Sequence, residues 1–174
     1  MSVVGGLRDR LIIENIRWLI EENLRLLGWY EENNTLIDYS ITVRSSPVED
    51  DEELLPNIVA VSTEGTTSDY LELGSDLEEF TWNFYIDIYA EDHASGLHLC
   101  GDIKAIIGGK LPSIGRLGKT LDIYDLTMAT PPVLFRVEVD KIESQRSRVY
   151  NKAFQKFWWV VGFQLTDSYL NDLD

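Results

Sequence analysis

The sequence predicts an α+β fold, in which a mostly antiparallel β-sheet is flanked by two main α-helices and closes with a long C-terminal β-hairpin. Three observations predict it. An amphipathic segment with three- and four-residue spacing opens the chain, strict alternation of apolar and polar residues follows over 80–90, and two long strand-like segments close the chain. The 174 residues, 44% of them hydrophobic, are expected to form one domain, 1–174, around one core.

The first half of the chain alternates between periodic segments and turn-forming residues. Leucine and isoleucine recur at helical spacing over 7–27, and Gly28 marks the end of this helix. Segment 45–56 is rich in acidic residues and bounded by a proline, which predicts an acidic loop. The strands expected around this loop are 36–43, 57–63 and a short one at 70–73.

The segment "FTWNFYIDIYA" over 80–90 has the clearest strand pattern, with one apolar and one semi-polar face. A helix follows over 94–107, and Asp92 is expected to cap it. The glycine-rich segment 108–118 predicts a flexible loop, and the acidic end, 167–174, a frayed tail. The remaining strands are expected at 121–128, 133–143 and 154–166, the last two forming the hairpin.

The charge is strongly acidic, with 15 basic against 30 acidic residues and a net charge of −15. Such a surface repels nucleic acid and anionic membranes unless the basic residues gather in one place. A single cysteine excludes an internal disulfide. The start of the chain lacks a signal-peptide pattern, so we expect a soluble protein made in a reducing cytoplasm.

The segment 81–111 contains both histidines and the only cysteine, which raises the question of an active site. On a helix, His98 and Asp102 would share one face, but His93 offers no clear third metal ligand. Cys100 and His98 would point apart, so Cys100 is interpreted as a small buried residue. We therefore predict no catalytic residue, no metal site and no bound cofactor.

The segment "GRLGKT" over 115–120 superficially suggests a phosphate-binding loop. It lacks the four residues required between the first glycine and the Gly-Lys pair. It also follows a predicted helix and precedes a strand, which is the reverse of the required order. A glycine-rich loop is the better interpretation.

The expected closing hairpin carries a concentration of positive charge. Six of the 15 basic residues fall within the 21 residues from 136 to 156, against three acidic ones. Such charges can simply prevent sheet-to-sheet association, or they can meet an acidic surface on a neighbouring copy or nucleic acid. Both interpretations stay open. The basic residues are Arg136, Lys141, Arg146, Arg148, Lys152 and Lys156.

Aromatic residues also fall on the expected outer face of the sheet. In "FWWVVGF", Trp158 and Val160 alternate with an apolar set, so both faces of this strand carry apolar side chains. Tyr85 and Tyr89 lie on the semi-polar face of segment 80–90. A partner subunit could cover this face, so Tyr85, Tyr89 and Trp158 are candidate interface residues.

The chain resembles the tail terminator, or tail-completion, proteins of long-tailed bacteriophages. The resemblance spans about residues 7–168 and lies in the leading amphipathic helix, an acidic variable loop, the F-x-W-x-F-x-I-x-I-x-A pattern that enters a helix, and the aromatic strand "FWWVVGFQLTD". It is a likeness of architecture and sequence style without a catalytic signature.

The resemblance implies a non-enzymatic virion protein, made in the host cytoplasm, that forms a hexameric ring. The implied partners are further copies of the chain, the tail tube protein and the head connector or head-completion protein. DNA would pass through the channel without specific binding, and no membrane is involved. The acidic balance is consistent with a channel wall to which DNA does not adhere. If the basic hairpin residues contact a neighbour, reversing the charges of Arg146 and Arg148 should weaken assembly.

Other functions stay open at this stage. The chain could be another neck component, such as a head-closure or adaptor protein. It could be a small cytoplasmic enzyme that uses His93, His98 and Asp102, which a zinc or iron signal would favour. It could also be an acidic domain that imitates nucleic acid and binds a basic partner as a monomer or dimer.

Overall fold

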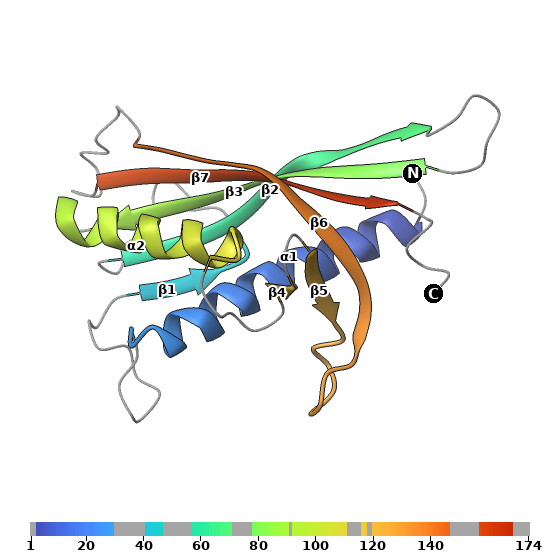
Figure 1. Ribbon diagram of the computed structural model, residues 1–174, viewed down its shortest axis with the longest axis horizontal. Helices are drawn as coiled ribbons and strands as arrows, with labels where there is room; N and C mark the ends of the chain where they lie inside the picture. Colours follow the sequence, from blue (N-terminus) through green and yellow to red (C-terminus); the bar gives the residue numbers. More distant parts are fainter. Residues whose placement is uncertain are drawn as a thin grey trace.

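The computed structural model describes residues 3–29, 41–46, 57–70, 78–90, 92–110, 116–117, 120–146 and 157–168. Within them lie two helices and one seven-stranded sheet (Figure 1). The elements in chain order are α1 (Val3–Leu26), β1 (Ile41–Arg44), β2 (Asn57–Tyr70), β3 (Glu78–Ala90), α2 (His93–Ile107), β4 (Arg116–Leu117), β5 (Thr120–Tyr124), β6 (Val133–Arg146) and β7 (Phe157–Ser168).

The sheet confirms the predicted α+β class and its mostly antiparallel character. Its strand order is β1-β2-β3-β7-β6-β5-β4, and only β1 and β2 run parallel. The central pair, β3 and β7, is in register from Glu79–Ser168 to Ala90–Phe157. Strands β6 and β7 form the predicted long C-terminal hairpin.

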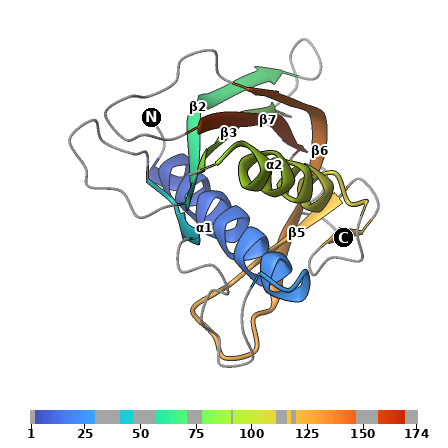
Figure 2. The ribbon, with the colours of Figure 1, turned by 90° about the vertical axis from the view of Figure 1, so that its left-hand side faces the viewer.

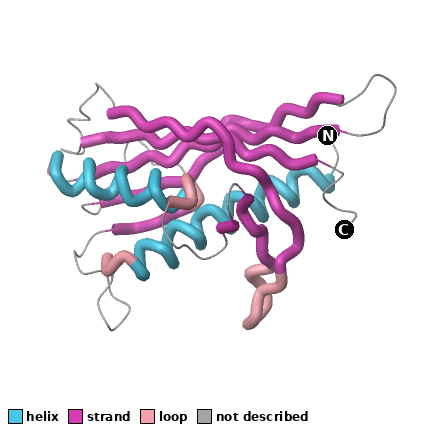
Figure 3. The backbone as a smooth tube through the Cα atoms, viewed as in Figure 1, coloured by secondary structure: helices cyan, strands magenta, loops and turns pink. Residues whose placement is uncertain are grey.

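The sheet curls around both helices, which lie on its inner face (Figure 2, and in the same view as Figure 1, Figure 3). Helix α2 packs against the centre of the sheet, on β3, β7 and β6. Helix α1 contacts β1 and β2 on one side and β5 on the other. Helix α1 therefore contacts both the β1–β2 side and the β5 side of the curled sheet.

Strand β3 shows why the sequence pattern is reliable here. Trp82, Phe84, Ile86 and Ile88 are almost completely buried against the helices, whereas the alternate residues are half-buried on the outer face. This two-residue periodicity places every second side chain in the core. Asn15 of α1 is also buried, and its side chain bonds both the backbone N–H and the carbonyl of Tyr124, which anchors β5 to the helix.

Both helices have the end signals that the sequence predicted. Gly28 has a φ of 84°, and its N–H and that of Trp29 donate to the carbonyls of Arg25 and Leu24, which ends α1 in a Schellman motif. Helix α1 begins one turn earlier than the predicted residue 7, at Val3. The Asp92 side chain accepts from the Ser95 N–H at 2.9 Å and caps α2 as predicted.

Several predicted boundaries were wrong. Strand β2 continues through residues 64–70, because it pairs with β3 along its whole length across a bulge at Thr63–Gly65. Strand β5 ends at Tyr124 and not at 128, because the Asp125 side chain accepts from the Thr127 N–H and hydroxyl and closes a turn.

Two predicted irregular segments contain strands. Residues 116–117 of the expected flexible loop 108–118 pair with β5 as β4. Residues 167–168 of the expected frayed tail pair with β3, because the ladder between β3 and β7 extends beyond the aromatic segment. Predictions for 36–40, 47–56, 71–73, 111–115, 118, 147–156 and 169–174 lie outside the described residues.

Candidate assembly surfaces

The outer face of β3 and β7 gathers the predicted aromatic residues. The register places Tyr89 opposite Trp158, Asp87 opposite Val160 and Tyr85 opposite Gly162. Neither α1 nor α2 lies on this side of the sheet (Figure 2). These six residues are called the uncovered sheet face, and the structure confirms that Tyr85, Tyr89 and Trp158 lie on it together.

The upper part of this face is a linked aromatic and acidic group. The rings of Tyr89 and Trp158 stack, with centroids 5.7 Å apart and an interplanar angle of 13°. The indole N–H of Trp158 donates to the Asp87 carboxylate at 2.8 Å. Burial raises the pKa of Asp87 above its usual value, and the hydrogen bond from Trp158 opposes this shift in part. The group is therefore held rigidly but contains a desolvated acid.

At the other end of the face, the position of the Tyr85 ring depends on the absence of a side chain at Gly162. A Cβ atom at this position would lie 3.6 Å from Cε1 of Tyr85, so the tyrosine ring lies close to the bare glycine backbone. The negative charge of Glu64 raises the pKa of Tyr85, with burial as a second cause. Next along the strands, the Gln164 amide donates to the Asn83 side chain at 2.8 Å. Polar side chains on and beside this face are therefore hydrogen-bonded or lie near a charged group, as polar groups at a water-containing protein interface are.

Of the six predicted basic residues, the structure describes the side chains of Arg136 and Lys141 alone. Arg136 donates to Asp122 at 2.7 Å, which offsets its charge locally. Arg136 and Arg146 are ten residues apart on β6, which is roughly 33 Å along an extended strand. Residues that are close in the sequence are therefore far apart in space. Lys141 is exposed at the bulge in β6, with a φ of 49°. Arg146 pairs by its backbone with Trp159, and Arg148, Lys152 and Lys156 lie outside the described residues.

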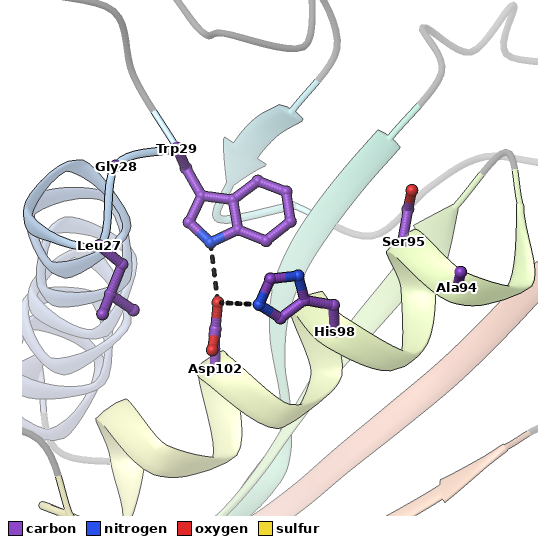
Figure 4. Close-up of a pocket in the computed structure, with 7 residues that line it drawn as sticks. All are labelled: Leu27, Gly28, Trp29, Ala94, Ser95, His98 and Asp102. Carbon is purple, nitrogen blue, oxygen red and sulfur yellow. Dashed lines mark hydrogen bonds and ion pairs between the residues drawn. The ribbon is translucent and has the colours of Figure 1, made fainter.

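A pocket of about 520 Å³ lies where α1 ends and α2 begins (Figure 4). The indole N–H of Trp29 donates to Oδ2 of Asp102 at 2.8 Å, and Nε2 of His98 lies 3.5 Å from the same oxygen. The Trp29 and His98 rings are 5.3 Å apart. We call this the end pocket, and its lining residues are Leu27, Gly28, Trp29, Ala94, Ser95, His98 and Asp102.

The end pocket brings together two of the three residues considered for an enzyme. His98 and Asp102 share a helix face, as predicted, but His93 instead packs against the rings of Phe157 and Trp159. Ser95 is the hydroxyl in the lining, and its Oγ donates to Asp92 at 2.6 Å as part of the helix cap. Within the described segments, no group of three or more His, Cys, Asp or Glu residues is placed to hold a metal ion.

The sequence analysis missed a third surface, the β5–β6 tip, residues 126–135. It projects away from the body of the protein (Figure 3). Met128, Val133 and Leu134 are 54%, 42% and 50% exposed. A signal was available, because "LTMATPPVLF" contains no charged residue in a chain that is 26% charged. Its apolar residues were assigned to strands, correctly for 133–135, and their exposure was not considered.

No protein-family model matches the chain, and the search of curated proteins also gave no match. Among the described residues, neither helix combines the length and the apolar character required to cross a membrane.

Proposed function

We propose that the protein is a non-enzymatic structural protein of a virion, a tail terminator of a long-tailed bacteriophage. In this role, copies of the chain assemble into a hexameric ring at the end of the tail tube. One side of the ring holds the tube protein and the other holds the head connector. DNA passes through the central channel without specific binding.

The observation that carries the proposal is how the segments behind the resemblance pack together. The F-x-W-x-F-x-I-x-I-x-A segment is β3, the polar turn is the Asp92 cap and the following helix is α2. The closing aromatic strand is β7, which pairs with β3 over its length, and α2 packs on both strands. The segments that carry the resemblance therefore form one packed unit, which is consistent with the architecture that the resemblance implies.

Two further features support assembly as the role of the chain. The β5–β6 tip presents exposed apolar side chains to solvent, and the uncovered sheet face carries half-buried aromatic side chains that neither helix covers, as surfaces that bind other proteins do. The net charge of −15 would make a channel wall to which DNA phosphates do not adhere.

The test is the native mass of the purified protein over a concentration series, with negative-stain imaging of any large species. We expect a closed ring of six copies with a central hole. Two controls accompany it, a metal analysis and a binding assay with double-stranded DNA, and both are expected to be negative. A protein that stays monomeric at every concentration contradicts self-assembly in solution, and a stoichiometric zinc or iron signal would favour an enzyme.

A further inference from the structure

The large hydrophobic side chains that are exposed in the described part of the chain fall into two separate sets. One set lies on the β5–β6 tip. The other lies where α1 ends and α2 begins, at and beside the end pocket: Leu27 lines the pocket, and Leu26 and Leu97 are the sequence neighbours of lining residues. The two sets are Met128, Val133 and Leu134, and Leu26, Leu27 and Leu97.

The β5–β6 tip has two features of a loop that inserts into a partner, because it projects and its backbone is constrained. It projects from the lower side of the molecule in Figure 1, and it comprises the turn after β5 and the first residues of β6. The N–H of Asp125 donates to the carbonyl of Pro132 at 3.0 Å, and the Asp125–Thr127 turn fixes one side of the loop. Two prolines restrict the backbone further. A loop ordered in advance loses little conformational entropy when it docks.

The end pocket has the room and the lining to hold an apolar side chain of another molecule. The pocket is open to solvent, and its volume of about 520 Å³ exceeds that of an engineered cavity of about 150 Å³ that holds a benzene ring. The N–H of Trp29 already donates to Asp102, so an apolar group placed against the indole leaves that donor satisfied. Ala94 is small and exposed, and the open position of Gly101 lies two turns further along α2. Both let another chain approach α2 closely.

We propose that the β5–β6 tip of one copy of this chain docks into the end pocket of the next copy. The inference rests on the proposed self-assembly and names its contact. Because the two surfaces are different parts of the molecule, the contact is heterologous, and repetition of it closes a ring or extends a filament. An uncharged tip also suits partners that each carry a charge of −15, since it adds no like-charge repulsion at the contact.

The experiment cross-links one cysteine on the tip to one in the pocket. Met128→Cys and Ala94→Cys are prepared as separate proteins, both exposed positions, and mixed with a short bis-maleimide. Cys100 is buried, and burial raises the pKa of its thiol, so it does not compete. Docking raises the effective thiol concentration, so we expect the mixture to form covalent dimers about 10–100-fold faster than a control mixture.

The control mixture pairs Met128→Cys with Arg10→Cys, an exposed residue about 25 Å along α1 from Leu27. Adding Leu134→Glu to the Met128→Cys protein should abolish the excess of dimer, whereas Thr42→Glu, exposed on β1, should not. Equal rates in the two mixtures, or rapid dimers from Met128→Cys alone, would overturn the inference. A wild-type ring without the cross-link contradicts only this contact, and the cross-link without a ring contradicts only the proposed function.

Discussion

Asp87 makes the stability of the uncovered sheet face depend on pH. Burial raises the pKa of this carboxyl in the folded state, so the folded protein holds a proton that the unfolded chain releases. Protonated Asp87 therefore favours the folded state. This contribution to the free energy of unfolding is complete below the ordinary aspartate pKa, and it is lost as the pH rises through the raised pKa of the folded state. Asp87→Asn keeps an oxygen to accept from Trp158 and has no charge to desolvate.

We expect the free energy of unfolding of Asp87→Asn to exceed that of the wild type at pH 7, with the difference shrinking below pH 4. Urea unfolding of both proteins from pH 3.5 to 7.5, at a concentration where they are monomeric, measures it. Asp92→Asn is the control of opposite sign, because hydrogen bonds from Ser95 lower the pKa of Asp92. It should be less stable than the wild type at pH 7. A lower free energy of unfolding for Asp87→Asn than for the wild type at pH 7 would contradict a destabilising charge at this position.

Single residues divide into those the sequence could place and those it could not. The Asp92 cap, the burial of Cys100 and the contact of His98 with Asp102 depend on spacing within one element, which periodicity reveals. The Arg136–Asp122 ion pair depends on which residues face each other across strands. Register is set by turns, bulges and burial over the whole sheet, so it cannot be read from one segment.

Helix α2 contains two glycines whose roles are opposite. Gly96 is buried, and a Cβ atom there would overlap the ring of Trp159. Gly101 is exposed, with open space where its Cβ would be. The first glycine permits close packing of α2 on β7, whereas the second only weakens the helix by its backbone freedom.

We expect Gly96→Ala to lower the free energy of unfolding by about 1–3 kcal/mol through overpacking. Gly101→Ala should raise it by about 0.5–1 kcal/mol. In a chain of this size each kcal/mol shifts the midpoint of thermal unfolding by about 2–4 °C, so calorimetry of the two variants beside the wild type resolves both signs. Destabilisation by Gly101→Ala would mean that something covers this position, and the measurement repeated at low protein concentration would show whether another copy does.

Among the elements, β3 and α2 were predicted almost to the residue, because their apolar spacing is long and strict. The extension of β2 over 64–70 was missed, because "EGTTSDY" has turn chemistry and no alternation. This segment forms a strand because the long edge of β3 offers it backbone pairing partners. The β5–β6 tip was missed for a different reason, since its apolar residues were assigned to strands, correctly for 133–135, and their exposure was not considered.

The molecule as a whole presents two possible driving forces for assembly, apolar docking of the tip and pairing of basic residues with an acidic neighbour. They differ in their response to salt. Copies with a charge of −15 repel one another, and screening removes that repulsion as the Debye length falls from about 10 Å at 0.1 M salt to about 3 Å at 1 M. Salt therefore strengthens a contact made by apolar groups and weakens one made by opposite charges.

We expect sedimentation velocity to show tighter self-association at 1 M than at 0.1 M sodium chloride. The double variant Arg146→Glu, Arg148→Glu separates the two forces further, since two reversals of −2 each change the net charge from −15 to −19. With apolar docking, this variant assembles more weakly at low salt but recovers at high salt, because only repulsion was added. If the arginines contact an acidic neighbour, assembly is lost at both salt concentrations and the wild type weakens as salt is raised.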